Sequence, residues 1–439
     1  MTANQLTVSQ ALERMRRGLL SPQELLTDCL DRIRQKEDST QAWLHLDAEA
    51  AQRSLAAPDK AAGQRLLPGI PVGIKDIIDV RGMPTSCNSP ASSHDAATRD
   101  AAFVGLLRAQ DAVILGKTDT VEFASGGRRA RTRNPHDPLR TPGASSSGSA
   151  AAVADFMVPL AFGTQTAGSV IRPAVFCGIY GFKPSHGAIS LEGVKPVAPS
   201  VDTLGWFTRS AADLALVAGG LGLALPAATA PSVGLKGLRL GLCRTPYWHR
   251  AELAGRAVLD RVADRLSAAG AELVEITLPA PFDGLAEALD IISQAEGGRA
   301  LQTEYVTQGT RLAPDFRQRV EQASALSANE LLPALDLVAA CRPAFDALFR
   351  DGPDALITLA APGVAPLLAK GTGDPIFCGM WTALHAPTLA IPAGRDPTSG
   401  MPIGIQIVGA RQSDGALLAL GEWIAKVIDP AASPAREEN

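Results

Sequence analysis

The N-terminal region carries apolar residues at the spacing of an amphipathic helix. They fall three or four positions apart and so share one helical face: Leu25, Leu26, Cys29, Leu30 and Ile33. Ser21 and Glu24 form a capping-box pattern before this stripe, with Pro22 at the first helical position, and Thr7 with Gln10 forms a second one. The pattern predicts two helices within about residues 5–38, which we interpret as packing elements.

Short apolar runs bounded by glycine and proline predict buried strands. Residues 66–80 (LLPGIPVGIKDIIDV) and 112–117 (AVILGK) are such runs, and 159–185 reads as a strand–turn–helix–strand passage. Further strands are predicted at 235–244, 272–278, 354–360, 388–394 and 403–409. Helical patterns separate the strands at 101–107, 150–158, 253–269, 283–350 and 414–427. This alternation along the chain predicts an α/β sandwich.

The bulk composition is that of a globular protein. The 439 residues are 46% hydrophobic and 20% charged, and the net charge of −4 gives no basic field that would favour nucleic acid as a partner. No apolar run reaches the roughly 18 residues of a membrane span, and the N-terminus lacks the apolar core of a secretory signal. Residues 226–231 resemble a linker, and 429–439 are predicted to form a disordered tail.

Cysteine and histidine give no sign of a metal or redox centre. The six cysteines and six histidines are dispersed, without a CxxC pair or an HExxH motif. We therefore expect reduced thiols in a cytoplasmic protein, and no metal site.

Lys75 is the first candidate for chemistry. It stands inside an apolar predicted strand, where loss of water favours the neutral amine, and a neutral amine can accept a proton near pH 7. The alternative is a lysine at a strand end whose ammonium group extends to solvent, and for an isolated lysine this alternative is favoured.

The run TPGASSSGSAAAVA (141–154) is the second candidate. Its small residues allow a tight backbone. A Walker-type phosphate loop would end in Gly-Lys-Ser/Thr, but Gly148 is followed by Ser149 and Ala150, so this interpretation is rejected. A flexible Gly/Ser linker is the other alternative, but the run opens directly into an apolar helix, which a tether would not need.

The segment GTQTAGSVIRPA (163–174) is the third candidate. Successive backbone N–H groups in a turn of small residues can converge on one point, as an oxyanion requires. Ser169 lies on this turn, where its hydroxyl could attack a bound carbonyl, although it could equally cap the following helix. No GxSxG motif is present, so the nucleophile elbow of α/β-hydrolases is not matched.

Taken together, these segments resemble the amidase signature family. Lys75 in GIPVGIKD, Ser145 in the serine run, Ser169 and the following GFKPSHGAIS carry the resemblance. It extends over most of the chain, with 280–370 the least similar stretch, through segments 202–215, 377–394 and 400–410. The resemblance implies a single α/β/α sandwich around a large mixed sheet. One domain would span residues 1–428, with a catalytic core at about 66–215 and a variable helical region at about 280–370.

The resemblance also assigns roles to individual residues. It implies that Ser169 is the nucleophile and that Ser145, after a cis peptide bond, links it to Lys75. The backbone N–H groups of four residues would form the oxyanion hole: Thr166, Ala167, Gly168 and Ser169. Four side chains are expected near the substrate, with Thr164 also supporting the nucleophile: Arg172, Thr164, Gln165 and Ser146.

The serine run and the turn that carries Ser169 depart from the commonest family pattern at four positions. Ala144, Ser147 and Ala167 stand where glycine is usual, and Gln165 stands for an aspartate, which removes a charge beside the turn. The position of Arg172, three residues after Ser169, resembles the malonamidase-like branch, where this arginine holds a substrate carboxylate. A structural ion pair under the turn is the alternative. Asp202 and Arg209 are interpreted as structural, and the arginines at 128–133 as a solvated loop.

The implied function is hydrolysis of a C–N acyl bond in a small amide, one option being an amide that carries a carboxylate. Carbamates (urethanes), esters and aryl anilides are alternatives with the same three residues. The glutaminase subunit of a tRNA-dependent amidotransferase and a non-catalytic scaffold are further ones. The resemblance implies no cofactor, no metal, no nucleic acid and no membrane as partners, and a homodimer is expected.

Overall fold

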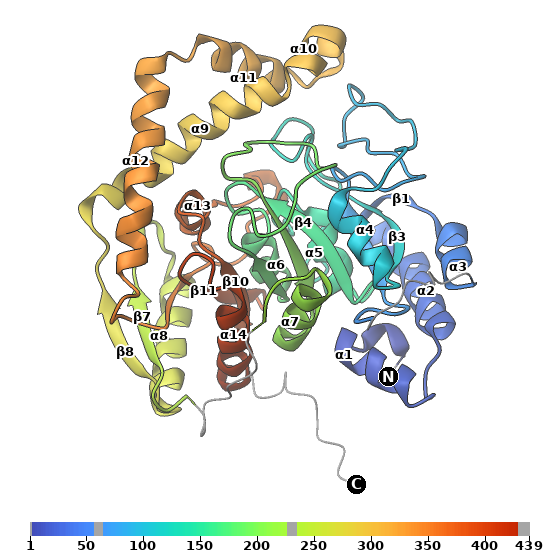
Figure 1. Cartoon of the computed structure of the whole chain (residues 1–439), viewed down its shortest axis with the longest axis horizontal. Helices are drawn as coiled ribbons and strands as arrows, with labels where there is room; N and C mark the ends of the chain where they lie inside the picture. Colours follow the sequence, from blue (N-terminus) through green and yellow to red (C-terminus); the bar gives the residue numbers. More distant parts are fainter. Residues whose placement is uncertain (1, 57–64, 226–234, 429–439) are drawn as a thin grey trace.

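Residues 2–56, 65–225 and 235–428 are described by the structure, a computed structural model. In this part of the chain one sheet of eleven strands runs in the order β1-β3-β2-β4-β6-β5-β10-β11-β9-β7-β8. Helices lie on both of its faces (Figure 1). The predicted α/β/α sandwich around a large mixed sheet is therefore confirmed. The linker-like segment at 226–231 and the tail at 429–439 lie outside the described residues.

The sheet is parallel in two places, among β2, β3 and β4 and among β7, β8 and β9, and antiparallel elsewhere. The strands are β1 (Trp43–Leu46), β2 (Pro71–Lys75), β3 (Val113–Thr118), β4 (Leu160–Gln165), β5 (Tyr180–Lys183), β6 (Thr203–Thr208), β7 (Arg239–Cys243), β8 (Glu272–Ile276), β9 (Ala355–Leu359), β10 (Thr388–Arg395) and β11 (Pro402–Val408).

Fourteen α-helices surround this sheet within the described ranges. They are α1 (Val8–Arg16), α2 (Pro22–Thr40), α3 (Ala48–Ala56), α4 (Ala102–Ala109), α5 (Ser147–Ala154), α6 (Ile171–Cys177), α7 (Ala211–Gly220), α8 (Leu253–Ala268), α9 (Leu285–Ala300), α10 (Gln302–Gln308), α11 (Pro314–Ala325), α12 (Ala328–Ala347), α13 (Ile376–Ala383) and α14 (Asp414–Ile428). Both predicted N-terminal capping boxes are formed, at Thr7 and at Ser21.

The two faces of the sheet bury two hydrophobic clusters. Alternate strand residues point to opposite faces, so Leu160 and Phe162 of β4 belong to a cluster that also holds residues of α1, α4, α7, α8 and α14. Ala161, between them, packs on the other face with residues of α3, α5 and α6. This double burial explains why the strands read as apolar runs rather than as alternating patterns.

Some boundaries and elements differ from the prediction. The strand expected over 66–80 is only β2, because the chain turns directly after it, where the N–H groups of Ile77 and Ile78 both donate to the Lys75 carbonyl oxygen. The helix expected at 150–158 is α5, which begins and ends earlier. The sequence did not predict β1, α3, β6, α7 or α13. The strand β6 was missed because it runs into Arg209 and Ser210 without a bounding glycine or proline.

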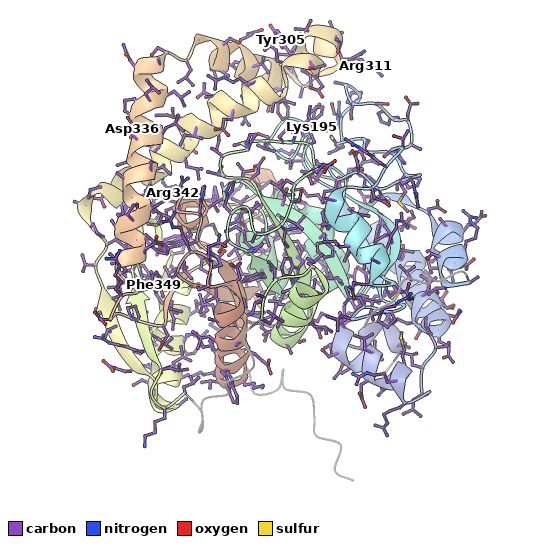
Figure 2. All side chains as sticks on the ribbon, in the orientation of Figure 1. Lys195, Tyr305, Arg311, Asp336, Arg342 and Phe349 are labelled. Atoms are coloured by element: carbon purple, nitrogen blue, oxygen red, sulfur yellow. The ribbon has the colours of Figure 1, made fainter. Side chains whose placement is uncertain are left out.

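The predicted helical region near 283–350 is formed by α9 to α12, which gather at one end of the molecule, away from α1 to α3 (Figure 1). Side chains attach this helical group to the rest of the protein. Lys195, on the loop below α9 and α11 (Figure 2), places its Nζ 2.6 Å from Glu304 Oε1 of α10. Arg342, labelled in Figure 2 where α12 approaches α13, donates to the Ala383 carbonyl oxygen.

Within the described residues, no helix has both the length and the apolar character that crossing a lipid bilayer requires.

Candidate active site

The candidate site lies where three parallel strands end at the same edge of the sheet. β2 pairs with β3 and with β4 in parallel, so their carboxyl ends lie side by side. Lys75 is the last residue of β2, and Gln165 is the last residue of β4. The turn that carries Ser169 follows β4 directly, before α6 begins at Ile171. The strands thus bring the first and third predicted candidates together.

Lys75 is completely buried and is surrounded by hydroxyl groups. Its Nζ lies 2.7 Å from Ser145 Oγ and 2.9 Å from Thr164 Oγ1. Burial lowers the pKa of Lys75 to about 7, against smaller opposing effects of Asp202 and Cys87. The solvent-extended lysine considered as an alternative is therefore wrong. A lysine in this setting exchanges protons near neutral pH.

Ser145 is held in place by the backbone around it. The Ala144–Ser145 peptide bond is cis, as the resemblance implied. Gly143 has a φ of 88°, and a Cβ at this position would lie 2.8 Å from the Pro173 Cα, so the position requires glycine. Arg172 donates a hydrogen bond of 2.6 Å to the Ala144 carbonyl oxygen.

The turn after β4 presents donors without acceptors. Among the described residues, no acceptor receives the backbone N–H groups of Ala167, Gly168 or Ser169, and the Ser169 hydroxyl makes no hydrogen bond. Main-chain donors of this kind are what a developing oxyanion requires. Of the predicted line of three side chains, the Lys75–Ser145 hydrogen bond is formed, whereas no hydrogen bond joins Ser145 to Ser169 among the described residues, so proton transfer between these two serines stays a prediction.

Two polar residues hold this turn from opposite sides. The Asp202 carboxylate accepts a hydrogen bond of 2.6 Å from the Thr166 hydroxyl and further bonds from the backbone N–H groups at 197 and 198. On the other side, the Thr382 hydroxyl of α13 donates to the Ala167 carbonyl oxygen. These contacts agree with the structural role predicted for Asp202.

The structure places the four expected substrate contacts inside the protein. Gln165 is 0% exposed and uses its amide within the turn and against α13. The Ser146 hydroxyl is buried against the Thr164 backbone. Thr164 contacts Lys75 rather than Ser169. The Arg172 guanidinium donates to the carbonyl oxygens of Gly373 and Ala144, and the structural ion pair considered as an alternative is absent among the described residues.

Sequence reasoning missed Thr382, which touches the turn. Its only signal was one hydroxyl residue inside the apolar helix FCGMWTAL, and a buried polar side chain needs a partner. Within the described part of the chain, no three His, Cys, Asp or Glu side chains are grouped as a metal ion would require.

Comparison with known proteins agrees with the site and the fold. The model of the family described as Amidase matches residues 24–418. The chain therefore belongs to the amidase family and is a hydrolase of carbon–nitrogen bonds.

Its relatives have several activities. The chain is 32% identical to a glutamyl-tRNA(Gln) amidotransferase subunit of Chloroflexus aggregans, over 97% of this chain and 96% of that one. It is 31% identical to the 2-amino-5-chloromuconic acid deaminase of Comamonas testosteroni, over 98% and 97% of the two chains. The solved peptide amidase of Stenotrophomonas maltophilia superposes with a TM-score of 0.80 and 27% identity, over 97% of each chain.

Proposed function

We propose that this chain hydrolyses a small amide through an acyl-enzyme formed on Ser169. The observation that carries the proposal is the buried Lys75 Nζ at 2.7 Å from the Ser145 hydroxyl. The pKa of Lys75 at about 7 leaves a large share of the amine neutral at physiological pH. A neutral amine beside a hydroxyl is a general base for a serine nucleophile.

In the proposed reaction, Lys75 takes the proton of Ser145, which takes the proton of Ser169, and the Ser169 oxygen attacks the carbonyl carbon. The N–H groups of the turn, from Thr166 to Ser169, bind the negative charge on the carbonyl oxygen. Ser145 then gives a proton to the leaving nitrogen as the C–N bond breaks. A water molecule attacks the acyl ester by the same proton route, which releases the acid and restores the Ser169 hydroxyl.

The first test compares purified wild-type protein with Ser169→Ala on aliphatic amides, malonamate, anilides and carbamates. We expect the wild type to turn over at least one of these substrates and Ser169→Ala to turn over none. Turnover by Ser169→Ala at the wild-type rate would reject the assignment. The same panel identifies the leaving group, since carbamates and anilides can react through the same residues as aliphatic amides.

Arg172 bears on whether the substrate carries a carboxylate. Two of its nitrogens already donate to main-chain carbonyl oxygens at 2.6 Å, those of Gly373 and Ala144. These contacts support a structural role, in which Arg172 holds the peptide before Ser145. Malonamate and its uncharged amide analogue separate the two roles of Arg172. If Arg172 binds the substrate carboxylate, the wild type prefers malonamate and Arg172→Met loses this preference. If Arg172 is structural, Arg172→Met lowers the rates with both substrates equally.

A second candidate function is the glutaminase subunit of an amidotransferase complex. The 32% identity to a subunit of a glutamyl-tRNA(Gln) amidotransferase favours it. Hydrolysis by the purified chain alone, as the homodimer we propose, would count against this candidate, and activity only with an added partner would support it. Labelling of Ser169 by a fluorophosphonate probe would exclude a non-catalytic scaffold.

A further inference from the structure

We propose that Gln165 and Thr382 are positioning residues that aim the oxyanion-binding N–H groups of the turn 166–169. The two side chains form a hydrogen-bond relay from the end of β4 through α13 to the turn. The proposal rests on the proposed function of this turn, and it adds two residues that do not touch the substrate.

The amide oxygen of Gln165 closes the turn. It accepts hydrogen bonds from the backbone N–H groups of Val170, at 2.8 Å, and Ile171, at 3.0 Å. These residues open α6, whose first N–H groups have no partner within the helix, and no side chain caps α6 at its N-cap residue. Gln165 thus supplies the missing cap from five residues upstream and fixes where the chain returns after Ser169.

The amide nitrogen of Gln165 sets the direction of the second contact. Its Nε2 donates to Thr382 Oγ1 at 3.0 Å. A hydroxyl has one proton to give, and of the two carbonyl oxygens within reach of Thr382 Oγ1, that of Ala167 is the nearer at 2.9 Å, against 3.5 Å for that of Cys378. The relay therefore has a fixed polarity, and it requires an N–H donor at Gln165. A carboxylate at this position would compete for the Thr382 proton.

Because the peptide group is planar, the hydrogen bond from Thr382 to the Ala167 carbonyl oxygen also fixes the direction of the Gly168 N–H group. In a trans peptide, the C=O and the following N–H point in opposite directions. When Thr382 holds the Ala167 carbonyl toward α13, the N–H of Gly168 points away from α13. That N–H is one of the donors without an acceptor among the described residues.

The helix that carries Thr382 is seated firmly against the turn. A Cβ at Gly168 would lie 3.0 Å from Pro375 Cβ and 3.1 Å from Cys378 Cβ, so no side chain separates the turn from α13. Arg342 of α12 anchors the other end of α13 through the Ala383 carbonyl oxygen (Figure 2). The relay therefore joins the turn to the helix α13, which is itself held by packing against Gly168 and by the hydrogen bond from Arg342.

The experiment measures the rate at which a fluorophosphonate probe labels Ser169, which needs no knowledge of the substrate. In this reaction Ser169 Oγ forms a bond to phosphorus, fluoride leaves, and the hydroxyl proton passes to the base. The phosphoryl oxygen would occupy the oxyanion site, so the maximal labelling rate reports on the turn and the probe's half-saturation concentration reports on binding.

Gln165→Glu keeps the length and the acceptor but removes the donor, and Thr382→Val removes the hydroxyl while keeping the shape. We expect each to lower the maximal labelling rate by about 10²-fold, the lower end of the loss when one oxyanion donor is removed. The half-saturation concentration should change less than about threefold. Thr382→Ser, which restores the hydroxyl, should label within about threefold of the wild type.

Gln406→Glu is the matched control. Gln406 of β11 is equally buried and donates to two carbonyl oxygens, at 359 and 377, without touching the turn. Its substitution should lower stability and leave the labelling rate of the folded protein unchanged. Wild-type labelling rates in folded Gln165→Glu or Thr382→Val, or equal losses in the Gln406→Glu control, would overturn the proposal.

The double variant Gln165→Glu/Thr382→Val tests whether the two residues act as one unit. Because they share one relay, we expect the double variant to label within about threefold of the slower single variant. A multiplied loss of about 10⁴-fold would show independent roles and contradict the relay. Absence of labelling in the wild type itself would overturn the proposed function and this inference together, whereas labelled wild type with unaffected variants overturns only the inference.

Discussion

Lys75 and Lys183, two of the completely buried lysines in the described residues, are each the last residue of a strand, and their surroundings differ. Burial lowers the pKa of Lys75, at the end of β2, to about 7, and it lowers the pKa of Lys183, at the end of β5, to about 7 as well. Lys75 contacts the hydroxyls of Ser145 and Thr164. Lys183 donates to two backbone carbonyl oxygens, those of Pro184 and Ala386.

The comparison shows that a low lysine pKa is not sufficient for a catalytic base. A carbonyl oxygen only accepts hydrogen bonds, so among the described residues Lys183 has no hydrogen-bond partner from which to take a proton. A hydroxyl both donates and accepts, so Ser145 can give a proton to Lys75 and receive one from another group. What distinguishes the two lysines is the partner rather than the burial.

Replacing the two lysines in turn gives the largest expected difference. Lys75→Met should lower the Ser169 labelling rate by at least about 10⁴-fold, because Lys75 is the one titratable side chain that the described residues place in hydrogen-bond contact with Ser145. Lys183→Met should leave the rate of the folded protein within about threefold. The measurement is the labelling rate, corrected for the folded fraction by circular dichroism. Equal losses in both variants would mean that burial alone matters, and a labelled Lys75→Met would remove the lysine from the mechanism.

Ser145→Ala removes the group that makes Lys75 different from Lys183. We expect a loss of about 10³-fold in the labelling rate, within the usual range for a general acid–base group, since water could still enter the space of the hydroxyl. Ser146→Ala is the neighbouring control, because the Ser146 hydroxyl is buried against the Thr164 backbone and does not contact Lys75. A Ser145→Ala protein with the activity of the Ser146→Ala protein would break the proposed proton route.

The sequence predicted the strands that carry these lysines better than it predicted their surroundings. The runs around Lys75 and 159–185 were recognisable because strands buried on both faces are continuously apolar, whether they pair in parallel, as β2 and β4 do, or antiparallel, as β5 does with its neighbours. The helix α13, which carries Thr382, was not recognisable, because its residues are almost all apolar and show no polar face from which a helix could be told apart from a strand. The substrate role expected for Gln165 followed from its place in the turn, but side-chain direction decides its partners, and the amide turns inward against Thr382.

The pH dependence of activity should follow Lys75 alone. Below its pKa of about 7 Lys75 is protonated and cannot act as a base, so activity should fall about tenfold per pH unit below 7 and level off above it. The profile of kcat/KM, or of the labelling rate, between pH 5.5 and 9 measures this dependence. Lys183→Met should retain the same profile. If the fall in activity below pH 7 shifts to another pH in Lys183→Met, the titrating group is Lys183 rather than Lys75. A profile that does not change with pH would show that activity does not depend on the protonation state of Lys75.

The smallest expected effect appears in stability, where both lysines should behave alike. Below pH 7 Lys183 is protonated in both states, and the folded protein bears the cost of a buried ammonium group. Between about pH 7 and 10 the unfolded chain binds a proton that the folded protein lacks, so stability rises with pH, by about 1.4 kcal/mol per unit for one lysine.

Lys183→Met removes this dependence. The unfolding free energy of the wild type minus that of the variant should therefore rise by roughly 1 kcal/mol per unit between pH 7.5 and 9 in urea titrations. Lost hydrogen bonds to Pro184 and Ala386 add an offset without a slope, because carbonyl oxygens do not titrate in this range. Lys75→Met should show the same slope. If this difference in unfolding free energy between wild type and Lys183→Met does not change with pH, Lys183 remains protonated in the folded protein. Burial would then favour the neutral amine at Lys75 and not at Lys183.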